Sequence, residues 1–578
     1  MTRTDSFVVG TLVVLLALVA GVIGVPALQP ASIASREPES TADPGAGRPY
    51  VEGVVGTPVS ISPLTARSQV DRDLVALLFS GLVRNGPAGT LVPDLASRWT
   101  VDPTGRTWTV QLRDDATWHD GEPVTAEDVV FTIRTLKDPA YTGPSASSWS
   151  EVSVRALSDK TVEFTLATPL GGFLHALTQP IAPAHILGDV PADLLPDHPF
   201  GEQPVGSGPF ALAELTPSSA SLVPAVGTTP VDEVEPDASA SATESVATPG
   251  PTRRPERPIP YLPGIELRFF TSEGMLADAF RSGSLDGATG ISPRLAAELG
   301  TLPGSRLLRY PGATLSTVLL NLRPDHPEFR SAAVRTALLA AIDRSRIIDE
   351  AYAGSAATAT DPIPAVSPLF DLSADPLVEY DKTAARKALK GADWTEKDDG
   401  WYPPGATKPL SIEVLSPEQD ANPGLFAAAV AVVRDWEAIG LKVKHAPLPP
   451  GEFVSDHLAK GAYQVAVADV AIGLDPDLYP LLASSQTLTG GSNVMGVQDP
   501  ALDALLVKAR APGTPEVRQA AYTALQQQLG RGRYLLPLAF ADEVAVIRDT
   551  VTGVAVRQVS DPSDRFWDVL TWRLAADR

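Results

Sequence analysis

Strict alternation of apolar and polar residues predicts half-buried β-strands at two places in the first third of the chain, 107–113 and 162–166. Successive side chains on a strand point to opposite faces, so Trp108, Val110 and Leu112 share one face and the polar residues between them share the other. Further strands are predicted at 54–61, 210–215, 265–270, 441–445 and 464–470.

Apolar residues spaced three and four apart predict amphipathic helices among these strands. The predicted helices cover 71–82, 332–342, 425–439, 502–509 and 522–529. Thr125 lies three residues before Asp128, which is the spacing of a capping box and predicts the start of one more helix. Strands that alternate with helices indicate α/β lobes with largely parallel sheets.

The length and charge of the chain narrow the class of protein. A chain of 578 residues is too long for one ordinary core, so we expect two or more lobes. The net charge of −23 argues against nucleic acid as a partner, because nucleic-acid affinity depends on Lys and Arg that neutralise phosphates. Cysteine is absent, which excludes disulfides, thiolate nucleophiles, thiolate metal sites and a lipid-modified cysteine.

An uncharged apolar stretch at 7–25 is long enough to cross a hydrocarbon layer of roughly 30 Å as a helix. Two interpretations compete for residues 1–25: a signal peptide cleaved near Ser32-x-Ala34, and a retained transmembrane anchor. We favour the anchor, because the apolar run exceeds the usual signal-peptide core. With the positive end inside, the chain after Pro26 lies outside the cytoplasm, and the Pro- and Ser-rich segment 26–49 is expected to be a disordered linker.

Proline, Ser, Thr, Ala and Glu accumulate between residues 216 and 263, with Tyr261 as the only aromatic residue. Such a composition buries too little apolar surface to offset the entropy of ordering the segment. We therefore predict a mostly disordered insertion at 216–263. The predicted strands on either side, 210–215 and 265–270, are expected to belong to one sheet.

Three blocks of sequence carry a resemblance to a known family. They read VPDLASRW at 92–99, GRTWTVQLR at 105–113 and WHDGEPVTAEDV at 118–129. In order and spacing they resemble the signature of the bacterial extracellular solute-binding proteins of family 5, the peptide, dipeptide and nickel receptors of ABC importers. GSGPF at 206–210 and VRTAL with AIDR between 334 and 344 are similar to further motifs of that family.

The resemblance implies a two-lobed periplasmic-binding-protein-like α/β fold, class II and of the large peptide-receptor type. In this chain the fold would follow the expected N-terminal transmembrane helix. We expect a first lobe at 50–312, a second lobe at 313–538 and a return to the first lobe at 539–578. The implied function is that of the substrate-binding component of an ABC importer. It would act as a monomer that captures short peptides by closure of the lobes and delivers them to membrane permease subunits.

The resemblance also implies where a ligand binds. Gly473, Leu474 and Asp475 precede Pro476 in a segment similar to the family's ligand loop, in which an acidic residue holds the peptide amino group, although the segment is shorter here than in oligopeptide receptors. Asn493 lies in a second similar segment. Four aromatic residues are candidates for covering ligand side chains, since aromatic faces grip varied groups. They are Tyr141, Trp149, Trp401 and Tyr479.

Other chemistry finds little support in the sequence. His119 lies in a turn motif and is expected to be structural, and the remaining histidines lack paired metal-ligand spacing, so no metal or cofactor is expected. The segment around Ser207 lacks the full G-x-S-x-G spacing of a nucleophile elbow, which argues against a hydrolase and leaves no catalytic residue. The alternative to an importer component is a family-derived scaffold or regulator of cell-envelope assembly, favoured modestly by the anchor and the insertion.

Overall fold

The computed structural model describes residues 47–87, 90–144, 149–225, 260–487 and 491–575. The residues from Gly47 onward form one compact unit. The expected anchor at 1–25 and most of the expected linker at 26–49 fall outside the described residues. Among the residues that are described, no helix combines the length and the apolar character needed to cross a bilayer.

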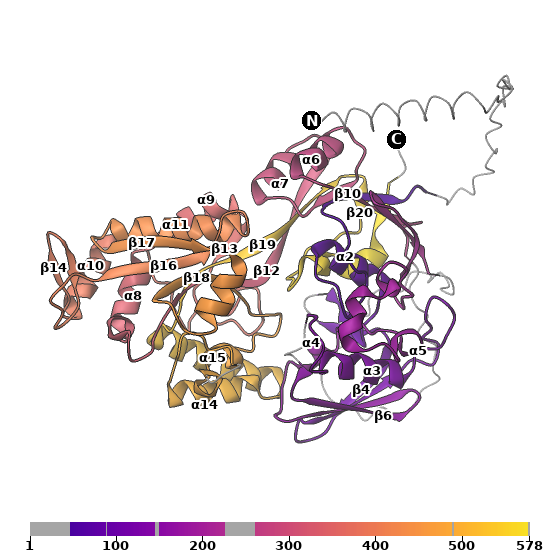
Figure 1. Ribbon diagram of the computed structural model, residues 1–578, viewed down its shortest axis with the longest axis horizontal. Coiled ribbons are helices and arrows are strands. Elements are labelled where there is room, and N and C mark those ends of the chain that lie inside the picture. Colours follow the sequence, from indigo (N-terminus) through magenta and orange to yellow (C-terminus); the bar gives the residue numbers. More distant parts are fainter. Residues whose placement is uncertain (1–46, 88–89, 145–148, 226–259, 488–490, 576–578) are drawn as a thin grey trace, which may run out of the picture. The chain divides into compact units, whose positions relative to one another are not determined.

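A large sheet runs through this unit (Figure 1). In the described part of the chain it has 11 strands, in the order β17-β16-β18-β12-β19-β11-β1-β10-β9-β8, with β13 paired to β19. The strands are β1 (Tyr50–Val55), β8 (Phe210–Leu215), β9 (Ser219–Pro224), β10 (Ile265–Phe270), β11 (Gly287–Thr289), β12 (Ser305–Leu320), β13 (Ala356–Thr358), β16 (Ser411–Pro417), β17 (Lys442–Leu448), β18 (Val465–Ala471) and β19 (Leu536–Arg548).

The sheet is mixed, so the expectation of largely parallel sheets is wrong. β1 runs parallel to β10 and β11, and β16 runs parallel to β17 and β18. β12 is antiparallel to both β18 and β19, and β19 is antiparallel to β11. The reason is connectivity: the chain leaves one parallel region along β12 and returns along β19, so the two long strands must run in opposite directions.

β12 and β19 join two lobes, each with its own apolar core (Figure 1). The first lobe comprises the described residues before β12 and after β19, and the second lobe comprises those between these strands. The two strands pair from Ser305 opposite Arg548 to Val318 opposite Leu536, with an irregularity between Pro311 and Leu315. The predicted lobe boundaries at 312 and 538 fall inside these strands.

The first lobe adds a four-stranded antiparallel sheet, in the order β4-β5-β7-β6, covered by helix α3. The capping box predicted at Thr125 and Asp128 is confirmed at the start of α3. The strand predicted at 54–61 is instead β1, which ends at Val55 because Gly56 turns the backbone with a φ of 102°. The elements are α2 (Gln69–Leu78), β2 (Val83–Asn85), β3 (Leu91–Pro93), β4 (Ala96–Val101), β5 (Thr107–Leu112), α3 (Ala126–Leu136), β6 (Val152–Ser158), β7 (Thr161–Leu166), α4 (Phe173–Ala176), α5 (Ala184–Leu187), the 3₁₀ helices η3 (Ala192–Asp197) and η4 (Pro199–Gly201), α6 (Glu273–Arg281) and α7 (Pro293–Leu299).

The predicted insertion at 216–263 is too long at both ends. Residues 219–224 form strand β9, which pairs with β8 on one side and with β10 on the other. At the other end Leu262 is buried in the core of the first lobe. Residues 226–259, the central part of the predicted insertion, lie outside the described residues.

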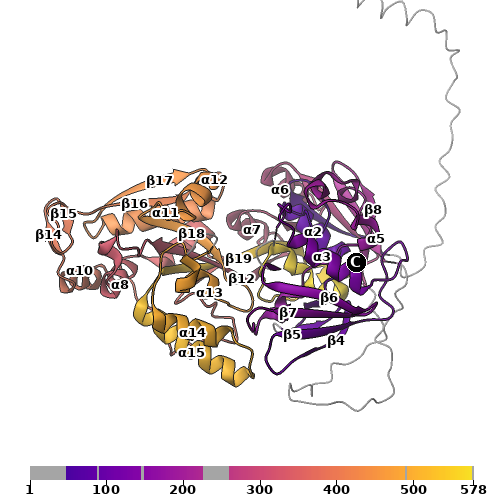
Figure 2. The same ribbon diagram turned by 60° about the horizontal axis from the view of Figure 1, so that its bottom comes forward.

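The second lobe packs helices against β16, β17 and β18, with α11 lying on this part of the sheet. α14 and α15 lie side by side below it in both views (Figures 1 and 2). The elements are the 3₁₀ helix η5 (Pro327–Phe329), α8 (Ala332–Ala340), α9 (Arg344–Tyr352), α10 (Lys382–Gly391), β14 (Thr395–Lys397), β15 (Gly400–Tyr402), α11 (Pro423–Glu437), α12 (Pro450–Glu452), the π-helical turn η6 (Phe453–Leu458), α13 (Tyr479–Leu482), the 3₁₀ helix η7 (Ser484–Thr487), α14 (Pro500–Arg510) and α15 (Pro515–Gly532).

After β19 the chain finishes in the first lobe. Its last elements are β20 (Val551–Thr552), the 3₁₀ helix η8 (Pro562–Thr571) and β21 (Arg573–Leu574). A buried ion-pair cluster fixes η8 in the first lobe, because Arg565 of η8 donates to Glu52 at 2.6 Å and to Asp73 at 2.7 Å. A buried charge this well paired is costly to separate, so η8 is held firmly beside α2.

Candidate functional site

Two adjacent cavities are the candidate binding site. The first, here called the α2 cavity, has a volume of about 1070 Å³ and is lined mainly by α2, β2 and η8 of the first lobe. The second, the inter-lobe cavity, has a volume of about 1240 Å³ and is lined by both lobes. The two cavities share His175 and Trp567 in their walls.

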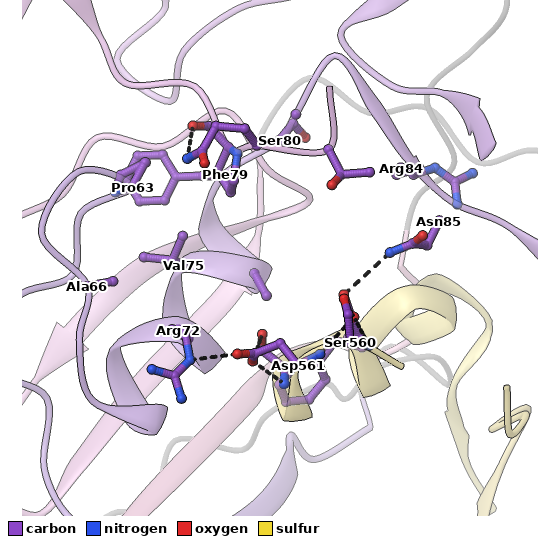
Figure 3. Close-up of a pocket in the computed structure, with 18 of the residues that line it drawn as sticks. Pro63, Ala66, Arg72, Val75, Phe79, Ser80, Arg84, Asn85, Ser560 and Asp561 are labelled. Atoms are coloured by element: carbon purple, nitrogen blue, oxygen red, sulfur yellow. Dashed lines mark hydrogen bonds and ion pairs between the residues drawn. The ribbon is translucent and has the colours of Figure 1, made fainter. Parts of the chain in front are cut away.

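The α2 cavity has apolar walls and a polar edge (Figure 3). Val75 and Phe79 come from α2 and the residue after it, and they supply apolar surface. Arg72 of α2 forms an ion pair at 2.8 Å with Asp561, the residue just before η8. Asn85 donates to Asp564 at 3.3 Å, so β2 and η8 are also linked across the edge. This arrangement suits a ligand with apolar side chains and a polar backbone.

The inter-lobe cavity brings together residues distant in sequence. His175 of α4 and Trp567 of η8 come from the first lobe, and Asp475 and Arg518 come from the second. The lobes also touch directly beside it, where the Gly171 backbone N–H donates to the Arg510 carbonyl at 2.8 Å. Burial lowers the pKa of His175 and the Asp475 carboxylate opposes that shift, so the imidazole is neutral at pH 7.

The predicted ligand loop lies at the inter-lobe cavity. Leu474 and Asp475 line it, and Gly473 begins the turn with a φ of 80°, a conformation that favours glycine. However, the Asp475 carboxylate accepts a hydrogen bond from Arg518 Nη2 at 2.7 Å and is only 10% exposed. A peptide ammonium would have to compete with this guanidinium, so the amine contact at Asp475 stays a prediction.

Two predicted aromatic residues lie near the α2 cavity. Trp149 is buried, lines this cavity and packs edge-on against Phe173. Tyr141 is also buried, and its hydroxyl donates to the Leu64 carbonyl at 2.6 Å. Burial raises the pKa of Tyr141 well above its ordinary value. Tyr141 therefore supports the cavity wall from behind, and Trp149 forms part of the wall itself.

Two of the predicted ligand residues lie in packed regions away from both cavities. Trp401 is fully buried in the core of the second lobe, where its indole N–H donates to the Ile439 carbonyl at 2.8 Å. Asn493 is buried as well, and its amide nitrogen donates to the Ala483 and Val497 carbonyls at 3.0 and 2.9 Å. Neither residue lines either cavity, because the indole fills core volume and the amide has its hydrogen bonds satisfied inside its own turn.

The remaining aromatic candidate also has a structural contact. The Tyr479 hydroxyl lies 3.0 Å from Ser485 Oγ, and the Arg510 guanidinium lies 4.5 Å from the centre of its ring. Tyr479 lines neither cavity. Among the described residues, no group of three or more His, Cys, Asp or Glu side chains is arranged to hold a metal ion.

Sequence reasoning missed the cavity residues of the C-terminal segment. Arg557 and Gln558 line the inter-lobe cavity from the chain between β20 and η8. His175, Arg518 and Trp567 were missed too. None of these residues lies in a block that resembles a family motif, and their separation in sequence gives no signal that the fold brings them together.

The sequence matches a family model over most of its length. The model is that of the bacterial extracellular solute-binding proteins, family 5 Middle, and it covers residues 90–492. The chain belongs to this family. Its members are extracellular solute-binding proteins of ABC importers, and the relatives of this chain include oligopeptide-binding proteins, so the expectation of an extracytoplasmic binding protein that is not an enzyme is confirmed.

Relatives of known name extend along nearly the whole chain. Protein XP55 of Streptomyces lividans is 29% identical and aligns with 89% of this chain and 87% of its own length. The oligopeptide-binding protein AppA of Bacillus subtilis is 23% identical and aligns with 94% of this chain and 95% of its own. The aligned regions therefore include residues of both lobes of this chain.

Solved structures show the same fold. AppA from Bacillus subtilis in complex with a nonapeptide superposes with a TM-score of 0.68 at 21% identity, covering 92% of this chain and 100% of that one. NikZ from Campylobacter jejuni in complex with Ni(L-His) gives 0.67 at 22% identity, covering 91% and 99%. The two-lobed periplasmic-binding-protein fold of the peptide-receptor type is thus confirmed for this chain.

Proposed function

We propose that this protein captures short peptides in the α2 and inter-lobe cavities and delivers them to the permease subunits of an ABC importer. The observation that carries the proposal is the pair of adjacent cavities, one of them lined by both lobes. Each volume, about 1070 and about 1240 Å³, lies at or above the usual upper range for a small-molecule pocket, so together they have room for several amino-acid residues.

Capture would work through the two strands that join the lobes. Only β12 and β19 carry the described chain from one lobe to the other, and their pairing is irregular between Pro311 and Leu315, next to the inter-lobe cavity wall at Pro311. A ligand that touches both walls binds the closed arrangement better than the open one and therefore shifts the population towards it. The permease would recognise the closed, loaded form.

We also propose that the chain works as a monomer held at the outer face of the cell membrane by residues 1–25, as a retained anchor. The support is the uncharged apolar run at 7–25 with Arg3 before it. Membrane fractionation with N-terminal sequencing tests the anchor. Recovery of a soluble chain that begins near Ser35 would contradict it.

The experiment that tests peptide capture is native mass spectrometry of the protein purified from its own membranes, followed by calorimetry with the peptides it releases. We expect bound peptides and saturable binding. A cleft that is always empty, in a protein that binds none of a mixed peptide library, would contradict capture and favour a scaffold of the cell envelope. Transport by the importer should also stop when the gene for this chain is deleted.

A further inference from the structure

Arg557 is a buried cation whose guanidinium has no hydrogen-bond partner among the described residues. The residue is 7% exposed, and its Nε, Nη1 and Nη2 atoms make no hydrogen bond within the part of the chain that the structure describes. It lines the inter-lobe cavity. Because an unpaired buried charge is costly, such a group is retained where something outside the protein completes its contacts.

The acidic residues nearest to Arg557 are committed to other donors. Asp564 accepts hydrogen bonds from the backbone N–H groups of Ser560 and Asp561, at 2.8 and 3.1 Å. Asp568 accepts from the Ala555 N–H at 2.6 Å and from the Trp572 indole at 2.7 Å. Burial lowers the pKa of Arg557 and these two carboxylates oppose the shift from a distance, but neither bonds to it.

The neighbouring residue offers another unmet donor to the same space. Gln558 lines the inter-lobe cavity, and its Nε2 atom is buried without a partner among the described residues. Trp567 holds the guanidinium in position: the Arg557 Cζ atom lies 5.4 Å from the centre of its ring, and the indole N–H is fixed to the Ala555 carbonyl at 3.1 Å. The Arg557 donors are therefore held in place at the cavity wall.

The other charges of the cavity do not neutralise Arg557. Asp475 is already balanced by Arg518 at 2.7 Å. His175 carries no charge at pH 7, since burial lowers its pKa. Glu516 also lines the cavity, but its side chain is exposed to solvent at the start of α15. Among the described buried side chains of the wall, Arg557 is therefore the cation to which no carboxylate is hydrogen-bonded.

We propose that Arg557, assisted by Gln558, binds a carboxylate of the ligand in the inter-lobe cavity. A guanidinium presents two parallel N–H groups that match the two oxygens of a carboxylate, and the Gln558 amide supplies a further donor. This inference rests on the proposed capture of peptides. It predicts that the preferred ligands are peptides that place a C-terminal or an acidic side-chain carboxylate beside Arg557.

Titration calorimetry with matched peptides tests the inference. One tetrapeptide is compared as the free acid and as the C-terminal amide, and a second pair differs by Glu against Gln in the side chain. In one of the two comparisons, we expect the wild-type chain to bind the peptide without the carboxylate about 30-fold or more weakly, which is the range for breaking a desolvated charge contact. The comparison that shows this loss identifies the source of the carboxylate. Equal affinities in both comparisons would overturn the inference.

Substitutions locate the effect. Arg557→Gln should remove the preference for the carboxylate, and Arg557→Lys should keep only part of it because a lysine lacks the planar fork. Arg573 is an exposed residue of the C-terminal segment, and it lines neither cavity. Arg573→Gln removes the same charge there, so the ligand preference of this variant should match that of the wild type. A preference that survives Arg557→Gln would overturn the assignment.

Stability without ligand separates a binding role from a structural one. Burying a cation without a hydrogen-bond partner costs free energy, so the thermal midpoint of ligand-free Arg557→Gln should equal or exceed that of the wild type. A lower midpoint in Arg557→Gln, with equal ligand-induced shifts in both chains, would show that the arginine is structural.

Binding of a small dicarboxylate tests the carboxylate site separately from peptide capture. Succinate should raise the thermal midpoint of the wild type but not of Arg557→Gln, and succinamide should affect neither. If succinate acts in this way while no peptide binds, the carboxylate site stands and peptide capture fails. If peptides bind but succinate and peptide carboxylates make no difference, capture stands and the site fails. If nothing binds, both fail.

Discussion

Asp475 and Arg518 form an ion pair in the wall of the inter-lobe cavity, with Arg518 Nη2 2.7 Å from the carboxylate. Asp475→Asn should lower the free energy of unfolding by about 1–3 kcal/mol, because it leaves a half-buried guanidinium without its charged partner. The double substitution Asp475→Asn with Arg518→Gln should recover most of that loss. Urea unfolding of the four chains gives the coupling free energy, and additive losses would contradict the pairing.

The same four chains test whether Asp475 holds a peptide amine. If Asp475 contacts the peptide amine, the double substitution should reduce the affinity for free-amine peptides more than the affinity for N-acetylated peptides of the same sequence. If both kinds of peptide lose affinity equally, Asp475 acts through Arg518 and not on the amine. Calorimetry with the paired peptides distinguishes the two roles.

Asp361 is a buried carboxylate in the second lobe that makes stability depend on pH. Burial raises its pKa to about 7, although the Ile363 N–H and the Gln526 amide donate to it at 2.7 and 3.0 Å. The folded chain therefore keeps a proton that the unfolded chain releases near pH 4. Through this group the free energy of unfolding falls as the pH rises from about 4 to about 7.

Asp361→Asn removes that ionisation. The free energy of unfolding of the variant minus that of the wild type should rise by up to about 4 kcal/mol as the pH goes from 4 to 8. The amide introduced at position 361 is a poorer partner for the Gln526 Nε2 donor, but this loss is the same at every pH. The change of the stability difference with pH therefore reports only the ionisation of the wild-type carboxyl group. Chemical unfolding across this range is the measurement, and a stability difference that does not change with pH would contradict the raised pKa.

The described residues on either side of 226–259 lead to two neighbouring antiparallel strands. β9 ends at Pro224 and β10 begins at Ile265, with Leu222 opposite Ile265 in register. A short connection is enough to join such strands. Replacing 226–259 by a short Gly/Ser linker should therefore leave the thermal midpoint nearly unchanged.

The control for that replacement is removal of β9 itself, 219–224, which pairs with both β8 and β10. This deletion should lower the midpoint strongly or prevent folding, because it removes the strand between two others. Differential scanning calorimetry on both variants is the measurement. A large loss of cooperativity in the linker variant would show that 226–259 contributes to the folded core.

At the scale of the whole molecule, the lobes meet where Gly172 of the first lobe faces Asp475 of the second. A Cβ atom at Gly172 would lie 2.8 Å from the Asp475 carboxyl carbon, which is closer than real contacts allow. Gly172→Val should therefore hold the lobes apart and weaken ligand binding by about 10-fold, or ~1.4 kcal/mol. Each lobe should stay folded, because Gly172 lies at the lobe contact.

Small-angle scattering and calorimetry measure this effect together. Wild-type protein should become more compact when ligand is added, and Gly172→Val should do so less. Gly274→Ala is the matched control, since a Cβ there meets only the Ser272 hydroxyl at 4.0 Å. Equal compaction and affinity in Gly172→Val and the control would show that closure does not pass through this contact.

The local elements and the family could be predicted from the amino-acid sequence alone. The predicted strands 210–215 and 265–270 match β8 and β10, and the capping box at Thr125 starts α3, because alternation, helical spacing and caps depend on residues close together in the chain. Prediction from the sequence failed for strand direction and for β9, since pairing with both neighbours overrides a composition that contains several Ser and Ala residues.

The candidate binding site, in contrast, depends on how the folded chain brings distant residues together. Trp401 and Asn493 belong to packed regions of the second lobe, a fact that residue type cannot reveal because an aromatic ring or an amide serves a core as well as a cleft. His175, Asp475, Arg518 and Arg557 meet at one cavity although hundreds of residues separate the first from the last. Their convergence arises because β12 and β19 carry the chain out of the first lobe and back, which sets contacts that no local pattern encodes.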